Sequence, residues 1–445
     1  MKDGPSDQKP TTIAPAANTA GEIWGRWPWV EPSVWTERML TALEEGVKGG
    51  KWYTLMDKIS STRNLRAAFA AVQANKGSAG VDHQTIAMFA NHLDENLADL
   101  AASLQNGTYR PAAIKRVWIP KPGSSEHRPL GIPTVRDRVV QAALRNALEP
   151  IFERDFAPQR YGFRPGRGCK DALRRVDELL HAGYRFVVDA DLKSYFDTIP
   201  HANLLRLIRR KIADSRVLGL LQAYLTQRVL DTVKDWTSDL GTPQGAVISP
   251  LLSNIYLDPL DHLLADAGID MVRYADDFVV LCRSEAEARH ALGMVERWTT
   301  SVGLVLHPDK THIVDASPRG GFDFLGYHFE RGYHWPRRKS LRKLKDNLRS
   351  LTKRTNGLSL ATIIADVNRS LVGWFGYFRH SHKTTFGPVD SWVRMRLRSI
   401  LRKRSGGRGR GRGSDHQRWP IACFAAHGLF SLSAAHAAAC QSARR

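Results

Sequence analysis

The sequence Val272-Arg273-Tyr274-Ala275-Asp276-Asp277-Phe278-Val279-Val280-Leu281 places two adjacent acids between two runs of strand-forming residues. Two short strands around a polar centre predict a β-hairpin over residues 271–282. Aspartate tolerates the backbone of a tight turn and keeps its carboxylate in solvent, so both acids are expected at the hairpin tip. Taken alone, the pattern is as typical of an ordinary turn as of a functional site.

A third acid makes a functional site the better interpretation. The segment Phe186-Val187-Val188-Asp189-Ala190-Asp191 is typical of a buried strand that ends in an acid. A carboxylate at a strand end, beside a hairpin tip with two more, can hold two Mg²⁺ ions, because Mg²⁺ prefers oxygen ligands. Two such ions support in-line nucleotidyl transfer without a side-chain base. We therefore predict Asp191, Asp276 and Asp277 as catalytic and metal-binding residues, with two Mg²⁺ ions that Mn²⁺ can replace.

The charge of the chain points to a polyanionic partner. The 445 residues contain 65 Lys and Arg against 44 Asp and Glu, which gives a net charge of +21. Residues 331–412 alone hold 22 Lys and Arg against 3 Asp and Glu. Such a concentrated basic stretch favours nucleic acid as the partner. Four cysteines and no apolar run of membrane-spanning length predict a soluble protein of a reducing cytoplasm, associated with the nucleoid when on DNA.

Beyond these features, the chain resembles reverse transcriptases. Tyr274-Ala275-Asp276-Asp277 is similar to their Tyr-x-Asp-Asp box, and four more blocks match in the expected order. These are Ile119-Pro120-Lys121-Pro122-Gly123 with Arg128-Pro129-Leu130-Gly131-Ile132-Pro133, Tyr161-Gly162-Phe163-Arg164-Pro165-Gly166-Arg167, the stretch 241–252 that contains Thr242-Pro243-Gln244-Gly245, and Phe324-Leu325-Gly326-Tyr327. Five ordered blocks are far more specific than any single box.

A closer resemblance is to group II intron-encoded proteins. Asn75-Lys76-Gly77, Gly80-Val81-Asp82 and Gly107-Thr108-Tyr109-Arg110-Pro111 look like the upstream extension of their fingers. Residues 367–378, with Gly373-Trp374-Phe375-Gly376-Tyr377-Phe378, look like their maturase (X) segment. The paired Cys-x-x-Cys motifs of an HNH endonuclease, which many relatives carry, are not found in this sequence.

The resemblance implies an α/β (α+β) right-hand polymerase. Its expected parts are a disordered tail with a Trp-rich extension (1–60), fingers and palm with an antiparallel sheet (61–335), a helical thumb (336–404), and a basic, flexible linker with a nucleic-acid-binding tail (405–445). The implied function is RNA-directed DNA polymerisation for a group II intron, with maturase activity in splicing and target-primed retrohoming. The implied partners are group II intron RNA, an RNA template, a DNA primer or target, and deoxynucleoside triphosphates. No membrane is expected, and a homodimer is left open.

The resemblance also assigns roles in nucleotide binding. Lys121 and Arg128 would grip the triphosphate, which their charge and their Gly/Pro-rich loop support independently. Phe196 would be the steric gate against a ribose 2′-OH, Gln244 would line the nucleotide pocket, and Lys310 would protonate the pyrophosphate. Core packing is the competing interpretation for Phe196, and a solvated turn is the competing one for Lys310.

Other interpretations stay open at this point. One is a different bacterial reverse transcriptase, of the retron or diversity-generating kind. Another is a splicing factor without polymerase activity, and a third is an RNA-templated RNA polymerase. Near the C-terminus, Cys423, His427, His436 and Cys440 form a Cys-x₃-His and a His-x₃-Cys pair, for which an apolar docking helix is preferred over a zinc site.

Overall fold

The computed structural model describes residues 20–120, 127–230, 235–236, 241–242, 245–411 and 413–442. The chain divides into two compact units. Unit 1 comprises residues 1–116, 131–156 and 200–256, and unit 2 comprises 117–130, 157–199 and 257–445. The first 19 residues, Lys121 and Gln244 lie outside the described part, so the expectations that fall on them stay predictions.

Unit 1 is mainly helical. Its helices are α1 (Ala20–Arg26), α2 (Glu37–Glu45), η1 (Lys48–Gly50), α3 (Met56–Ile59), α4 (Thr62–Asn75), α5 (Ile86–Asn91), α6 (Leu93–Gln105), α7 (Val135–Glu153), α10 (His201–Ile208) and α11 (Ser215–Leu225). The packing centre is α7, where long runs of apolar residues are buried against α4. Trp35 is fully buried, and its indole N–H donates to the carbonyl of Asn146 in α7 at 3.0 Å. The Trp-rich extension therefore anchors the N-terminal segment on this core.

A four-stranded sheet has the order β2-β1-β4-β5. Its strands are β1 (Ile114–Pro120), β2 (His127–Ile132), β4 (Val229–Leu230) and β5 (Asp235–Trp236). Strand β1 pairs in parallel with β4 through Ile114 opposite Val229. Arg128 lies on β2 with an exposed side chain.

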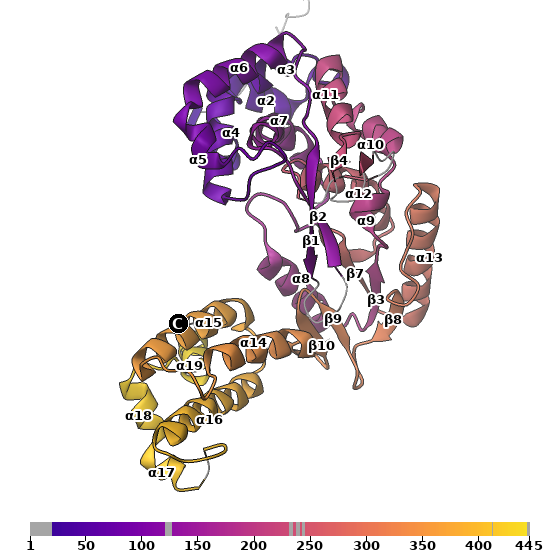
Figure 1. Ribbon diagram of the computed structural model, residues 1–445. Coiled ribbons are helices and arrows are strands. Elements are labelled where there is room, and N and C mark those ends of the chain that lie inside the picture. The colour runs from indigo at the N-terminus through magenta and orange to yellow at the C-terminus, as the bar shows by residue number, and fades with distance from the viewer. Residues whose placement is uncertain are drawn as a thin grey trace, which may run out of the picture. The chain divides into compact units, whose positions relative to one another are not determined.

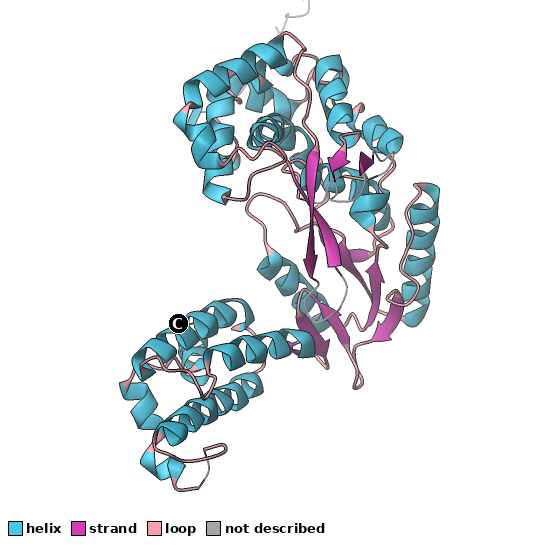
Figure 2. Cartoon of the chain, viewed as in Figure 1, coloured by secondary structure: helices cyan, strands magenta, loops and turns pink. Residues whose placement is uncertain are grey.

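The second unit is built on the antiparallel sheet β6-β7-β3-β8, here called the hairpin sheet (Figure 2). Its strands are β3 (Phe186–Asp191), β6 (Asp270–Tyr274), β7 (Asp277–Cys282) and β8 (His312–Asp315). Helix α13 (Glu285–Ser301) packs against β3 and β7 (Figure 1). The remaining helices beside this sheet are α8 (Cys169–His181), α9 (Tyr195–Thr198) and α12 (Ser249–Asp266). The antiparallel sheet confirms the predicted fold class.

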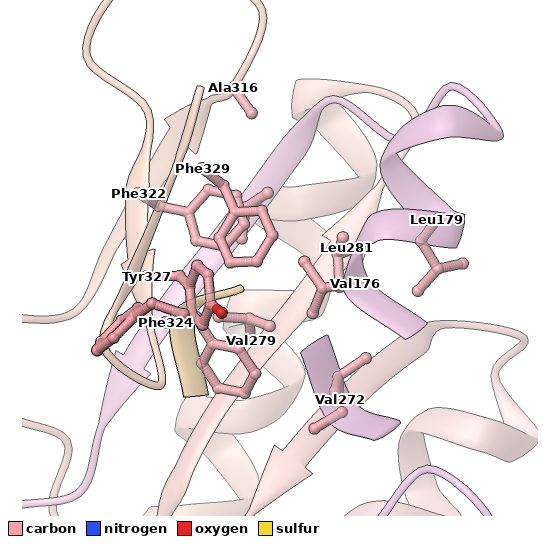
Figure 3. Packing of buried hydrophobic residues seen from close by; sticks show 13 residues of the cluster. Val176, Leu179, Val272, Val279, Leu281, Ala316, Phe322, Phe324, Tyr327 and Phe329 are labelled. Atoms are coloured by element: carbon pink, nitrogen blue, oxygen red, sulfur yellow. The ribbon is translucent and has the colours of Figure 1, made fainter. Parts of the chain in front are cut away.

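A small three-stranded sheet, β11-β10-β9, covers the apolar core of unit 2. Its strands are β9 (Phe322–Phe324), β10 (Tyr327–Glu330) and β11 (Tyr333–Pro336). Alternate side chains of β9 and β10 are buried, as expected for strands with one face on a core. Phe322, Phe324, Tyr327 and Phe329 gather beside Val279 of β7 (Figure 3). The aromatic half of this core joins the small sheet to the hairpin sheet.

The C-terminal part is helical. It contains α14 (Arg338–Leu351), α15 (Leu360–Phe378), η2 (Lys383–Thr385), α16 (Phe386–Arg404), α17 (Asp415–Arg418), α18 (Ile421–Ala426) and α19 (Leu432–Ser442). A second apolar core forms where α14, α15, α16 and the last two helices meet, with Leu348, Val367 and Leu397 fully or almost fully buried. Within the described residues, no helix combines the length and the apolarity that crossing a membrane would require.

Residues 405–411, which their Arg-Gly composition predicts as a flexible linker, contact α16. Gly411 is buried, and its N–H donates to Ser399 Oγ at 3.3 Å. A Cβ at Gly411 would lie 2.7 Å from Arg398 Cβ, and one at Gly407 would lie 2.6 Å from Arg402 Cγ. The glycines therefore let this loop pack directly on α16.

Candidate active site

The two predicted acids lie at the tip of the β6–β7 hairpin. Tyr274 pairs with Asp277, so Ala275 and Asp276 form a two-residue turn. Ala275 has φ +61°, in the left-handed region that tight hairpin turns need at their first central residue and that glycine usually fills. An alanine there is strained, and such strain persists only where surrounding structure holds it. The predicted hairpin is confirmed.

A buried ion pair next to this turn holds it in place. Arg273 and Asp261 of α12 are both fully buried, and the Nε and Nη2 groups of Arg273 donate to the two carboxylate oxygens of Asp261, with Nε at 2.7 Å from Oδ1. The same guanidinium donates from Nη1 to the carbonyl of Ala275 at 2.8 Å. Asp261 thus fixes Arg273, and Arg273 fixes the turn residue next to Asp276.

Segment 159–162 braces the hairpin from its open edge. Tyr161 N–H donates to the Arg273 carbonyl at 2.8 Å, and Arg273 N–H donates to the Gln159 carbonyl at 3.1 Å. A Cβ at Gly162 would lie 2.3 Å from Ala275 N, closer than real Cβ atoms approach. Glycine is therefore required at position 162 because the turn backbone passes directly over it.

Asp191 reaches the same place from β3. In the β3–β7 ladder it pairs directly with Asp277. Its carbonyl accepts from His307 N–H at 2.7 Å, and its Oδ2 lies 2.5 Å from the ammonium of Lys310. One loop, 305–310, thus holds both the backbone and the side chain of Asp191. The predicted juxtaposition of Asp191, Asp276 and Asp277 is present, and Lys310 lies beside them.

The acids around the turn repel one another. Asp277 is open to solvent at the edge of a cavity, yet surrounding protein partly desolvates it. This desolvation is the largest cause that raises the pKa of Asp277, which reaches about 7. The carboxylates of Asp189, Asp276 and Asp191 raise it further, in that order, and Arg337 lowers it by a smaller amount. Burial also raises the pKa of Asp276 and brings that of Asp189 to about 6. Crowded carboxylates with raised pKa values are typical of functional sites, because they gain most from a cation.

The carboxylates of Asp191, Asp276 and Asp277 are chemically suited to a hard divalent cation, but they are not already arranged around one metal position. The oxygens of Asp191, Asp276 and Asp277 are the ligand type that Mg²⁺ prefers. Among the described residues, no three His, Cys, Asp or Glu side chains are arranged to hold a metal ion as they stand. The ammonium of Lys310 is the positive group that contacts Asp191 in this structure.

The other predicted site residues have different outcomes. Phe196 is half-buried on α9, with its ring 5.4 Å from that of Tyr195. The residue before this helix, Ser194, has φ +50°, so the chain turns sharply between Asp191 and Phe196. Gln244 lies outside the described residues, but its neighbours are fixed: Gly241 O bonds His201 Nε2 at 2.6 Å, and Val247 N–H donates to Gln141 at 2.8 Å. The roles of Lys121, Arg128, Phe196 and Gln244 stay predictions.

A cavity of about 590 Å³ adjoins Asp277. One wall is the Leu325-Gly326 turn between β9 and β10, and the other is formed by α14 and α15. Leu325 and Gly326 have φ +45° and +84°, as in a tight hairpin turn. Tyr377 Oη donates to the Leu325 carbonyl at 2.7 Å, and Ser340 Oγ donates to that of Gly326 at 3.1 Å. The C-terminal helices therefore set the position of this turn beside the acids.

Sequence reasoning missed several residues of the site. Asp261, Arg273 and Gly162 hold the turn, and Arg337 lies close enough to lower the pKa of Asp277. Arginine in an otherwise apolar strand was the available signal for Arg273, because a charge there needs a buried partner. Cys423, His427, His436 and Cys440 belong to no group of three metal-binding side chains in the described chain.

Family comparison places these features in a known class. Residues 119–329 match the model "Reverse transcriptase (RNA-dependent DNA polymerase)", and residues 341–419 match "Group II intron, maturase-specific domain". Protein YkfC of Escherichia coli is 33% identical over 349 residues, which cover 68% of this chain and 86% of that protein. Group II intron-encoded protein LtrA of Lactococcus lactis is 38% identical over 199 residues, 44% of this chain and 33% of LtrA.

Among solved structures, a chain of a Cas6-RT-Cas1–Cas2 complex is 23% identical, with a TM-score of 0.35. The alignment covers 56% of this chain and 42% of the other. The two family models together span most of residues 119–419, and the E. coli relative is matched over nearly its whole length. The chain therefore belongs to the family of group II intron-encoded reverse transcriptases and maturases, which makes it an RNA-directed DNA polymerase by class.

Proposed function

We propose that this protein extends a DNA primer on an RNA template by two-Mg²⁺ nucleotidyl transfer, and that it serves the splicing and retrohoming of a group II intron. The observation that carries the chemistry is the direct pairing of Asp191 with Asp277, one residue from Asp276. Family membership supports the template and the intron RNA as partners.

Asp191, Asp276 and Asp277 would hold the metal ions. When bound, such ions activate the primer 3′-OH and neutralise charge on the leaving pyrophosphate. The raised pKa values of Asp276 and Asp277 support this assignment, because partly desolvated, crowded carboxylates gain from a neutralising partner. Lys310, whose ammonium contacts Asp191, would be placed to donate a proton to the pyrophosphate.

The cavity beside Asp277 suits the primer end. Arg337, Lys343 and Asn347 line it and offer cationic and polar groups to a phosphate backbone. Lys121 and Arg128 would hold the triphosphate, Gln244 would contact the nucleotide, and Phe196 would exclude the 2′-OH. The half-buried ring of Phe196, close after Asp191 in the chain, is compatible with that gate.

Primer extension with matched variants tests this proposal. Asp191→Ala or Asp276→Ala should lower DNA synthesis on an RNA template by roughly 10³-fold or more, because the developing charge loses its support. RNA binding should persist, since the basic segment is retained. Asp315→Ala is the control, because Asp315 is an exposed residue of β8 that pairs with Phe186, at the end of β3 away from Asp191. Near wild-type extension by Asp276→Ala would show that the assignment is wrong.

A further inference from the structure

The turn between β9 and β10 forms one wall of the cavity beside Asp277. Phe324 and Tyr327 pair across it, so Leu325 and Gly326 are its two central residues. Their φ values of +45° and +84° are positive, as in the type I′ hairpin turn that Asn-Gly favours. Leucine is an unusual first residue there, because its Cβ crowds the backbone in the left-handed region. Such a conformation persists only where neighbouring groups hold it.

Donors from later in the chain hold this turn. The Tyr377 hydroxyl of α15 donates to the Leu325 carbonyl at 2.7 Å. The Gly326 carbonyl accepts from the Ser340 hydroxyl at 3.1 Å and from the Arg337 N–H at 2.9 Å. The ring of Tyr377 also packs on the turn, since its Cε1 would lie 3.9 Å from a Cβ at Gly326. Tyr377 is therefore the side chain that bonds the strained leucine itself.

The Tyr377 hydroxyl has a second neighbour. The thiol of Cys169, the first residue of α8, interacts with the hydroxyl of Tyr377 and with that of Tyr274 in the β6–β7 hairpin. Tyr377 is thus linked directly to the Leu325-Gly326 turn and, through Cys169, to the hairpin. The direct bond is the stronger link, because a thiol is a weak donor and a weak acceptor, whereas a carbonyl oxygen is a full acceptor.

We propose that the Tyr377 hydroxyl is a positioning group for the primer end during extension. It acts through the Leu325-Gly326 turn, which it holds in place as a wall of the cavity beside Asp277. Leu325 lies in the part of the chain that matches reverse transcriptases, and Tyr377 lies in the part that matches the maturase-specific domain. The maturase-specific part therefore contributes to the chemical step itself. This inference rests on the proposed polymerase function and adds a residue to it.

Three single variants of the full-length protein test the proposal in single-turnover primer extension on an RNA template. Tyr377→Phe removes only the hydroxyl. Tyr184→Phe removes a hydroxyl from another tyrosine packed on the same apolar core, where it bonds Asp270 at the far end of β6 from the hairpin turn. Cys169→Ala removes the second neighbour of Tyr377 and leaves the bond to Leu325. Thermal unfolding and the affinity for primer-free RNA are measured on the same preparations.

The single-turnover rate constant of Tyr377→Phe should fall roughly 3- to 10-fold, which is the loss expected for one neutral hydrogen bond. The deoxynucleoside triphosphate concentration for half-maximal rate should stay within about twofold, because only the placement of the primer end changes. Affinity for primer-free RNA should be kept. Tyr184→Phe and Cys169→Ala should keep the wild-type rate constant within about twofold. An equal loss of rate in Tyr377→Phe and in either control would overturn the proposal.

A substitution in the turn separates positioning from a general effect on stability. Leu325→Asn gives the turn the Asn-Gly sequence that a type I′ turn favours, so the turn should depend less on its outside donors. In the Leu325→Asn background, adding Tyr377→Phe should therefore change the rate constant by less than about twofold. The same loss in both backgrounds would show that the hydroxyl does not act through the turn. Failure of the polymerase assignment is distinct, because it would appear as near wild-type extension by Asp276→Ala.

Discussion

Replacing Gly162 by alanine should damage catalysis through the backbone of the turn, without touching any acid. A Cβ at this position would lie 2.3 Å from Ala275 N and 2.8 Å from the carbonyl carbon of Tyr274. Ordinary contact begins at 3.4 Å, so the two segments must separate by about 1.1 Å. Backbone atoms form the obstruction, so no side chain can rotate out of the way.

The displacement should reach the reacting groups. Segment 159–162 is tied to β6 by backbone hydrogen bonds of 2.8 and 3.1 Å, and the turn is tied to Arg273 at 2.8 Å. Because hydrogen bonds hold both segment 159–162 and the turn, neither can move away freely. The displacement should therefore extend to Asp276, which follows Ala275 in the turn. A misplacement of about 1 Å can lower a rate about 100-fold, so kcat for primer extension should fall by roughly that factor.

The assay is single-turnover primer extension on an RNA template, with thermal unfolding and RNA affinity measured on the same preparations. Gly219→Ala is the control, because Gly219 lies inside α11 and a Cβ there would meet nothing within 4 Å. Gly162→Ala should keep the RNA affinity, while Gly219→Ala should keep both affinity and rate. If Gly162→Ala extends primers as fast as Gly219→Ala, the turn is not braced in the way the structure indicates.

Three further perturbations address other parts of the molecule. Phe196→Val should allow ribonucleotide incorporation while deoxynucleotide use is largely kept, and unchanged sugar discrimination in single-nucleotide extension would assign Phe196 to the core. Asp261→Ala should lower the free energy of unfolding by about 3–5 kcal/mol in urea titration, because it leaves Arg273 charged and unpaired, and adding Arg273→Met should restore most of it. Burial raises the pKa of Asp137 above 3.8, so the native state binds that proton more tightly than the unfolded chain. The free energy of unfolding should therefore fall as the pH rises from below 3.8 through the pKa that Asp137 has in the folded protein. Asp137→Asn should remove this part of the pH dependence of stability. An identical pH dependence in both proteins would contradict the prediction.

The sequence was sufficient to predict the parts that depend on local pattern. Strand formers around two acids predicted the hairpin, and an acid that ends a buried strand predicted the position of Asp191. Both signals work because alternation and turn chemistry act over a few neighbouring residues. The ordered family blocks then supplied the class of enzyme, which agrees with the family models.

The missed features depend on contacts between distant residues. Arg273 and Asp261 lie 12 residues apart on different elements, and no spacing rule says that a strand arginine will meet a helix aspartate inside the core. Gly162 has an ordinary place in its own motif, and only the approach of Ala275 makes it necessary. Family motifs mark such residues without giving their physical reason.

The same distinction changes how the basic C-terminal region should be understood. A count of charge treats every arginine as available to a polyanion, yet several are used inside the protein. Arg402 bonds Asp415 at 2.5 Å and the Arg408 carbonyl at 2.8 Å, and Arg404 donates to the Asn356 carbonyl at 3.2 Å. Arg396 donates to the Thr352 carbonyl at 2.7 Å, next to the end of α14. In α14, by contrast, Arg338, Lys339 and Arg342 have no ion pair or side-chain hydrogen bond among the described residues, whereas Arg349 pairs with Asp346. Affinity for RNA should therefore fall more when Arg338, Lys339 and Arg342 are neutralised than when Arg396, Arg402 and Arg404 of α16 are, because removing the latter would first weaken contacts within the fold.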